Sequence, residues 1–390
     1  MSDDVIHDCE AVHGYVSRIC FKNGPPARVG AELEFLLAGD QPEIPISLAR
    51  VRACLLPALP FPGGSSLTFE PGGQVELSSP PARSLTSLVT GLAADVDHLT
   101  RTLGNAGLRM LDTAVDPLRP PRRQLVSPRY DAMESYFDGL EPGSPADERV
   151  GRTMMCSTAA IQVNLDAGSD PAARWRLLHD LGPVLLASFA NSPTRLGRPT
   201  GWKSTRQQVW LSLDPRRTAP IDEDEPVAAY AERALDAEVM LQPGRGTLRD
   251  WVESSDPPSV DDLAQHLSTL FPPVRPRGWF EVRFIDAQPV RWWPVPIAVL
   301  GTLLDDPVAA DLAAEAAEPA RGRWESAARS GLDDPVLDKA ATRCFEIARD
   351  SLSRHEPLLT GLVDGFADEY VARGRCPADD QLPASQSGVA

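Results

Sequence analysis

Amides, carboxylates and apolar residues alternate in a way that could line a site for a polar ligand. Segment 154–166 (MMCSTAAIQVNLD) places Gln162, Asn164 and Asp166 on one side of a predicted strand, because strand side chains alternate with a period of two. The intervening residues of its second half are apolar. An ordinary solvated strand face would be richer in Lys, Thr or Ser. This face is therefore a candidate ligand-binding surface.

Three further segments repeat the pattern with glutamates. Segment 67–79 is interrupted by Pro71-Gly72-Gly73, a sequence typical of a turn, and so predicts two strands. In each segment the charged residues fall on one face and apolar residues on the other. The charged residues are Glu32 and Glu34 in 29–37, Glu70 and Glu76 in 67–79, and Glu281 with Arg283 in 278–285.

These glutamates predict a magnesium site if the four segments lie side by side. Neighbouring strands are about 4.8 Å apart, so the carboxylates would come within reach of shared metal ions. Unpaired, such carboxylates would repel one another strongly, and hard cations such as Mg²⁺ relieve that repulsion and prefer oxygen ligands. The alternative is that each strand is a solvated outer face, which requires all five glutamates to be incidental. The candidate metal ligands are Glu32, Glu34, Glu70, Glu76 and Glu281.

Two arginine-rich segments supply positive charge for an anionic ligand. Arginine binds phosphate and carboxylate through two parallel hydrogen bonds, and the prolines in 271–283 restrict the backbone there. Arg283 is the strongest candidate because it shares a strand face with Glu281, and Lys203 is a weaker one. Any single arginine could instead form a structural ion pair. The candidates are Arg206, Arg217 and the nearby Trp210 in 204–218, and Arg275, Arg277 and Arg283 in 271–283.

Composition excludes several other classes of protein. The net charge of −17, from 55 acidic and 38 basic residues, argues against a nucleic-acid-binding surface. The six cysteines form no CxxC pair, which indicates reduced thiols rather than a zinc site or a disulfide framework. No signal pattern or long apolar run occurs, so we expect a cytoplasmic protein without a membrane span. None of the six histidines lies in a polar-faced segment, so none is a candidate general base.

The order of the predicted elements indicates an α+β fold with an antiparallel sheet. Helices are predicted over 85–103, from Asp170-Pro171 to about 191, over 228–240 and 260–270, and from Pro294 to about Val371. Residues 119–141 are expected to form a long loop or a short helix with a functional role. We expect one catalytic domain over 25–375, a peripheral segment over 1–24, and a disordered tail over 376–390.

Several motifs together resemble the plant-type glutamate–cysteine ligase family of the glutamine synthetase-like ligases. These are GAELEF, FEPGGQVELSSPP, MMCSTAAIQVNLD, STRQQVWLSLDPRRT and FPPVRPRGWFEVRFIDAQP. The resemblance runs from about Val29 to Pro296 and is greatest to the actinobacterial branch that serves ergothioneine biosynthesis. It implies an antiparallel sheet wrapped into a funnel with helices outside. It also implies that ATP and magnesium drive the joining of glutamate to cysteine through γ-glutamyl phosphate.

The resemblance also implies a role for each candidate residue. The five glutamates would hold two or more Mg²⁺ ions, and Arg283 with Arg275 or Arg277 would neutralise the transferred phosphoryl group. Trp210 would line the cysteine pocket, or else be a core aromatic residue. Glutamate would be positioned by Thr158, Gln162 and Asn164, and a substrate carboxylate or phosphate would be bound by Arg206 or Arg217.

Two other functions stay open from the sequence. The acceptor could be an amine other than cysteine, since the acceptor pocket has no separate signature. The protein could also be a ligand-binding relative that has lost catalysis, although the complete set of glutamates and Arg283 argue against this. Plant members carry a regulatory disulfide, for which no matching cysteine pair is found here. No pattern indicates an oligomeric state.

Overall fold

The computed structural model describes residues 5–24, 28–146 and 148–382. Its central element is an antiparallel sheet of six strands in the order β3-β4-β1-β6-β10-β9. The predicted polar-faced strands are confirmed, with one correction: residues 154–157 belong to a helix, α5 (Val150–Ser157), and the strand begins only at Ala160. The strands are β1 (Val29–Phe35), β3 (Ser66–Phe69), β4 (Val75–Ser78), β6 (Ala160–Asp166), β9 (Val274–Pro276) and β10 (Trp279–Asp286).

The register of the sheet aligns the polar faces of its strands. Glu34 of β1 lies opposite Glu76 of β4, and Glu32 lies opposite Gln162 of β6. Glu281 of β10 lies between Asn164 of β6 and Arg275 of β9. The ladder of β10 and β6 shifts register after Val282, and such bulges often redirect a side chain beside a functional site.

The other face of the sheet is apolar and is covered by helices. Leu33, Val163 and Val282 are fully buried there, in the main core of the molecule. Helix α3 contacts β1, α12 contacts β6, and α6 contacts β10. Helix α6 begins as predicted, with the Asp170 side chain accepting a hydrogen bond from the backbone N–H of Ala173. These helices are α3 (Leu85–Asn105), α6 (Pro171–Phe189) and α12 (Pro294–Asp305).

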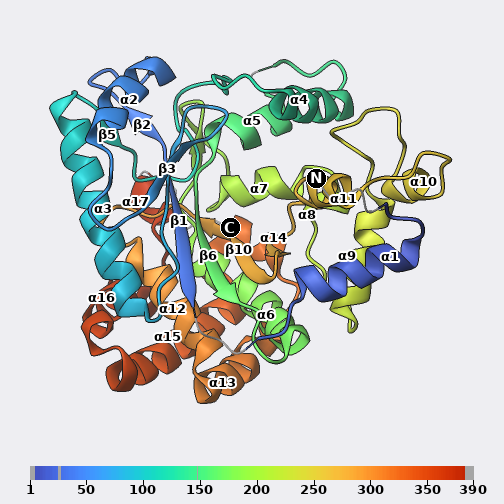
Figure 1. The fold of residues 1–390 in the computed structure, drawn as a ribbon. Helices are drawn as coiled ribbons and strands as arrows, with labels where there is room; N and C mark the ends of the chain where they lie inside the picture. The colour runs from blue at the N-terminus through green and yellow to red at the C-terminus, as the bar shows by residue number, and fades with distance from the viewer. Residues whose placement is uncertain (1–4, 25–27, 147, 383–390) are drawn as a thin grey trace.

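A second group of helices lies over the polar face. It consists of α5 with α4 (Pro128–Leu140) and α7 (Thr205–Leu211), so the stretch expected as a loop or short helix contains a helix of 13 residues. In the view of Figure 1, α4, α5 and α7 gather at the top, α12 lies in the lower half, and β1 and β6 run between them. The sheet therefore has one face buried against the main core and one face beneath a smaller cap.

Residues 5–24 differ from the peripheral position expected for residues 1–24, of which residues 1–4 lie outside the described residues. Helix α1 (Cys9–Tyr15) continues into a π-helix (Val16–Cys20), and Val12, Val16 and Phe21 are buried in the main core. At the other end, α17 (Ala378–Gln381) lies within the stretch expected to be a disordered tail, and Cys376 and Ala378 are buried. Residues 383–390 of that expected tail lie outside the described residues.

The remaining elements complete the helical shell, and the predicted helices near 228–240, 260–270 and after Pro294 are confirmed. No helix among the described residues is long and apolar enough to cross a membrane. The other helices are α2 (Leu48–Leu55), α8 (Pro215–Thr218), α9 (Pro226–Asp236), α10 (Leu248–Val252), α11 (Val260–Leu267), α13 (Pro307–Ala317), α14 (Trp324–Ser330), α15 (Pro335–His355) and α16 (Pro357–Glu369). The short strands are β2 (Leu37–Ala38), β5 (Arg109–Met110), β7 (Thr194–Arg195) and β8 (Arg198–Pro199).

Candidate active site

A cavity of about 230 Å³ lies between the polar face of the sheet and the cap of helices. The structure brings together at this cavity every residue predicted for the site except Asn164, Arg217 and the weaker candidate Lys203, which pairs with Asp333 and Asp379 instead. The sheet supplies the carboxylates and most of the arginines, while α7 supplies Arg206 and Trp210. The predicted residues in the lining are Glu32, Glu34, Glu70, Glu76, Glu281, Thr158, Gln162, Arg206, Trp210, Arg275, Arg277 and Arg283.

Asn164 and Arg217 have other contacts. The Asn164 amide donates to Glu32 Oε1 at 3.1 Å, and its oxygen accepts from Trp279 Nε1 at 2.9 Å, so Asn164 orients Glu32. Arg217 is fully buried, and its Nη1 donates to the carbonyl and hydroxyl oxygens of Thr269 at 3.0 and 2.8 Å. Because its guanidinium holds α8 against the start of segment 269–271, we no longer assign Arg217 to substrate.

Glu281 is surrounded by three arginines. Its carboxylate oxygens lie 2.7 Å from Arg275 Nε, 2.9 Å from Arg277 Nη1 and 2.8 Å from Arg283 Nη1. Burial alone would raise the pKa of Glu281, but these cations hold that pKa well below its usual value. Glu281 is therefore ionised at neutral pH and fixes the direction of all three guanidinium groups.

The half-buried glutamates Glu32, Glu34 and Glu70 behave in the opposite way. Glu34 accepts hydrogen bonds from Gln162 Nε2 at 2.7 Å and from the Ala160 N–H at 2.8 Å. Burial, followed by repulsion from Glu76, nevertheless raises the pKa of Glu34 to about 7. Burial and repulsion from Glu34 and Glu76 raise the pKa of Glu70 to about 8, and burial also raises that of Glu32. If these glutamates were all ionised, their negative charge would therefore exceed what the surrounding protein groups offset.

The chemistry of these donors fits a divalent cation. Carboxylate oxygens are the ligands that Mg²⁺ prefers, and a bound cation would offset the repulsion among Glu32, Glu34, Glu70 and Glu76. In residues 5–24, 28–146 and 148–382, however, no three acidic, histidine or cysteine side chains converge closely enough to form a complete metal site. Hydrogen bonds occupy several carboxylates instead, as where Thr68 Oγ1 donates to Glu76 Oε1 at 2.6 Å.

Arg206 is a buried cation with unused donors. Its side chain is 3% exposed, and its Nη2 donates to the carbonyl oxygen of Arg283 at 2.7 Å. Its Nη1 lies 3.7 Å from Asp286 Oδ1, and neither Nη1 nor Nε forms a hydrogen bond. Arg206 nevertheless lines the cavity, so its charge can act on an anionic ligand there.

The sequence did not reveal the apolar wall of the cavity. The cap adds several residues that were not predicted, and most belong to a second hydrophobic cluster around Phe137. The Pro- and Arg-rich stretch 119–141 suggested a functional segment. It was expected to be a long loop or a short helix, so the sequence did not show which of its side chains would face the sheet. The additional residues are Arg129, Tyr130 and Met133 of α4, Met154 and Met155 of α5, and Phe271.

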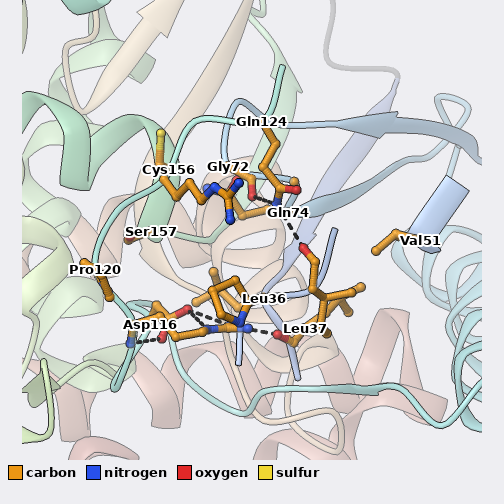
Figure 2. A pocket seen from close by; sticks show the side chains of 15 residues that line it. Leu36, Leu37, Val51, Gly72, Gln74, Asp116, Pro120, Gln124, Cys156 and Ser157 are labelled. Atoms are coloured by element: carbon orange, nitrogen blue, oxygen red, sulfur yellow. Dashed lines mark hydrogen bonds and ion pairs between the residues drawn. The ribbon is translucent and has the colours of Figure 1, made fainter. Parts of the chain in front are cut away.

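Gln74 lines both this cavity and a smaller one of about 50 Å³. Figure 2 shows the smaller cavity, with Gln74, Leu36 and Cys156 around it. Its volume is enough for a few water molecules but not for an amino acid. Cys156 lines the smaller cavity and belongs to the second hydrophobic cluster, and burial raises the pKa of its thiol to about 12, so it is not a reactive thiolate.

A cavity of this kind defines a class of protein that handles anionic ligands by charge neutralisation. Its described lining contains carboxylates, arginines and amides, which are groups that bind charged ligands and neutralise developing charge. The chain belongs to glutamate–cysteine ligase family 2 (GCS2), whose family model matches residues 28–388. The family resemblance of the sequence is thereby confirmed.

Individual relatives agree with this assignment. The chain is 43% identical to the glutamate–cysteine ligase EgtA of Mycobacterium tuberculosis over 97% of its own length and 91% of that protein. It is 40% identical to EgtA of Mycolicibacterium smegmatis, over 96% and 94% of the two chains. The chloroplastic glutamate–cysteine ligase of Arabidopsis thaliana is 28% identical over 82% of this chain and 66% of that one.

A solved structure supports the fold. The glutamate–cysteine ligase of Francisella tularensis in complex with AMP matches with a TM-score of 0.54 at 16% identity. The match covers 92% of this chain and 84% of that one.

Proposed function

We propose that this protein uses ATP to join the γ-carboxylate of glutamate to the amine of cysteine, giving γ-glutamylcysteine, ADP and phosphate. The main support for this proposal is one cavity in a chain of this ligase family. The cavity combines glutamates that repel one another with arginines that Glu281 orients. By family resemblance, the sheet forms the wall of a funnel. The same resemblance supports a role of the product in ergothioneine biosynthesis. The funnel, this pathway and the cytoplasmic location expected from the sequence all stay predictions.

The reaction proceeds in two steps. A γ-carboxylate oxygen of glutamate attacks the γ-phosphorus of ATP, and ADP leaves. The cysteine amine then attacks the γ-carbonyl carbon of γ-glutamyl phosphate, and phosphate leaves with loss of an amine proton. Both steps need positioning and charge neutralisation rather than a protein nucleophile.

The residues of the cavity divide these tasks by charge. Arg283 and Arg275, held by Glu281 in the lining of the cavity, would neutralise the phosphoryl oxygens. Arg206, which lines the same cavity, would attract a substrate carboxylate or phosphate by its charge. Trp210, with the methionines of α4 and α5, offers an apolar wall to less polar parts of the substrates.

Magnesium would be held by Glu32, Glu34, Glu70 and Glu76, and it would supply positive charge to the phosphate oxygens. Glu281 was also predicted as a metal ligand. Its ion pairs with three arginines favour a role in orienting these arginines.

Release of ADP by the purified protein tests this proposal. With ATP, magnesium and glutamate present, we expect ADP release to depend on cysteine and γ-glutamylcysteine to appear by mass spectrometry. ADP release with another amine but not with cysteine would keep the mechanism and change the acceptor. No ADP release with any amine would favour the alternative of an inactive ligand-binding relative.

A further inference from the structure

We propose that the C-terminal segment Cys376–Leu382 positions Arg206 for catalysis, acting through Asp286 and the loop residues that hold it. The inference rests on the proposed function, because Arg206 matters only if the cavity binds an anionic substrate. The segment itself does not line the cavity. The residues of the segment that contact the loops, Ala378, Asp379 and Gln381, are therefore positioning residues, not catalytic ones.

The first step of the argument is the immobilisation of Asp286. This carboxylate is fully buried at the end of β10. Its Oδ1 accepts from Ser204 Oγ at 2.9 Å, and its Oδ2 accepts from the Asn191 N–H at 2.9 Å and from Ser192 Oγ at 2.8 Å. Asp286 is thus held by donors from two loops and is the carboxylate nearest to Nη1 of Arg206.

The second step is the direct link between these loops and Arg206. Arg206 lies in the first turn of α7, whose N-cap is Ser204. The backbone N–H of Arg206 donates to Ser192 Oγ at 3.1 Å, the same hydroxyl that donates to Asp286. A shift of either loop would therefore move both the backbone of Arg206 and its carboxylate partner.

The third step is the attachment of the C-terminal segment to both loops. The Ala378 N–H donates to the Ala190 carbonyl at 3.0 Å, and the Gln381 side chain donates to Asn191 Oδ1. Asp379 forms an ion pair with the buried Lys203, the residue directly before Ser204. The segment therefore contacts Ala190 and Asn191 in one loop and Lys203 in the other, beside the donors that hold Asp286. We call this set of contacts the clamp.

Two features favour a positioning role over a purely structural one. Arg206 donates one side-chain hydrogen bond, at Nη2, and its carboxylate partner Asp286 lies 3.7 Å from Nη1, so the direction of its guanidinium depends on how Asp286 is held. Lys203 has a second carboxylate partner, Asp333, at 3.2 Å, so loss of Asp379 does not leave a buried cation unpaired. The fold can therefore survive a change that loosens the clamp.

Asp379→Asn tests the proposal, with Asp380→Asn as the matched control. Asp380 is the neighbouring carboxylate on α17, but its partners are Tyr370 and Arg375 rather than the two loops. We expect Asp379→Asn to lower kcat/KM about tenfold with little change in melting temperature, since small misplacements of a substrate-binding group cost activity steeply. Asp380→Asn should retain wild-type kinetics. Equal kinetics in the two variants would overturn the positioning role.

A double-mutant cycle with Arg206→Lys then separates positioning from general destabilisation. If the segment acts through Arg206, Asp379→Asn should lower kcat/KM by less than about twofold when Arg206→Lys is already present. The same tenfold fall in both backgrounds would overturn the proposal. If Asp379→Asn does not fold, Gln381→Ala carries the same cycle, because Gln381 is the other side-chain contact of the clamp.

The wild-type assay keeps the two proposals apart. A wild-type protein without cysteine-dependent ADP release would refute the proposed function. An active wild-type enzyme whose Asp379→Asn variant matches Asp380→Asn would refute only the clamp.

Discussion

The glutamates of the cavity fall into two groups that differ in their charge. Glu281 is paired with three arginines and is ionised at neutral pH, while Glu32, Glu34 and Glu70 are half-buried beside other carboxylates and have raised pKa values. The first group orients cations permanently present in the protein. The second group is suited to a cation that arrives with the nucleotide. Two predictions at the scale of single residues follow from this difference.

Glu32→Gln should remove most activity without unfolding the protein. Glutamine keeps the size of the side chain and a hydrogen-bond acceptor for Asn164, but it loses the charge that a metal ion needs. We expect turnover to fall by roughly two orders of magnitude, the usual scale for loss of an electrostatic catalytic group. Steady-state ADP release and a thermal melt measure the two effects. Glu315→Gln, at an exposed site on α13, is the control, and normal turnover in Glu32→Gln would contradict the metal assignment.

The stability of the protein should depend on pH and magnesium together. Between the ordinary pKa of a glutamate and the raised values of about 7 and 8 for Glu34 and Glu70, the folded state holds protons that the unfolded chain has lost. These groups therefore make the ligand-free protein less stable as pH rises through that range. Magnesium favours the ionised form, so its stabilising effect on the melting temperature should be larger at about pH 8.5 than at about pH 6. A magnesium effect that is equal at both pH values, or unaffected by Glu34→Gln, would argue against these carboxylates as ligands.

At the scale of elements, the turn between β3 and β4 decides where Glu70 and Gln74 lie. Gly73 has a φ of +92°, which favours glycine, and a Cβ on Gly72 would approach the Cys156 carbonyl oxygen to 2.1 Å. The turn is thus packed directly against the end of α5. The elements that carry the carboxylates and the apolar wall are fitted to each other at this point.

Gly72→Ala should therefore destabilise the protein by about 1–3 kcal/mol, the usual cost of overpacking, and should impair catalysis as well. Chemical denaturation and ADP release measure the two quantities. Gly361→Ala is a suitable control, because a Cβ there meets nothing within 4 Å inside α16, and alanine favours a helix. Equal stability of the two variants would show that the turn can move away from α5 without cost.

At the scale of the whole molecule, the N-terminal segment is part of the core that supports the site. The ring of Phe21 lies 5.1 Å from that of Trp175 on α6 and 5.8 Å from that of Phe280 on β10, measured between centroids. Phe280 directly precedes Glu281. The segment therefore packs against the strand that orients the three arginines, from the side opposite the cavity.

Phe21→Ala should cost about 3–5 kcal/mol of the free energy of unfolding, as for other buried aromatic residues. Urea denaturation followed by tryptophan fluorescence measures this loss. Ile19→Ala, in the same segment at a residue that is 49% exposed, should change stability by less than about 1 kcal/mol. Similar small losses in both variants would mean that the segment is only loosely attached.

The sequence by itself determined which strands carry chemistry and which side chains of each strand share a face. Because strand side chains alternate with a period of two, the local sequence fixes which face carries Glu32, Glu34, Gln162 and Arg283. A one-residue shift in a strand would have moved its polar side chains to the apolar face. The helix beginning at Asp170-Pro171 was likewise set by its N-cap and by proline in the first turn. The family could be predicted because its motifs are continuous stretches on these elements.

The tertiary structure alone decided how these faces are paired and what covers them. Contacts between residues far apart in the chain hold Arg217 away from the cavity. Such contacts also bring α4 and α5 to the cavity, where they supply its apolar wall. The same holds for Phe21, which looked peripheral, and for Asp379, which lies in a stretch with the composition of a disordered tail. Local sequence preferences carry no information about such distant partners. Burial and long-range hydrogen bonds, which arise only when the whole chain packs, gave these residues their roles.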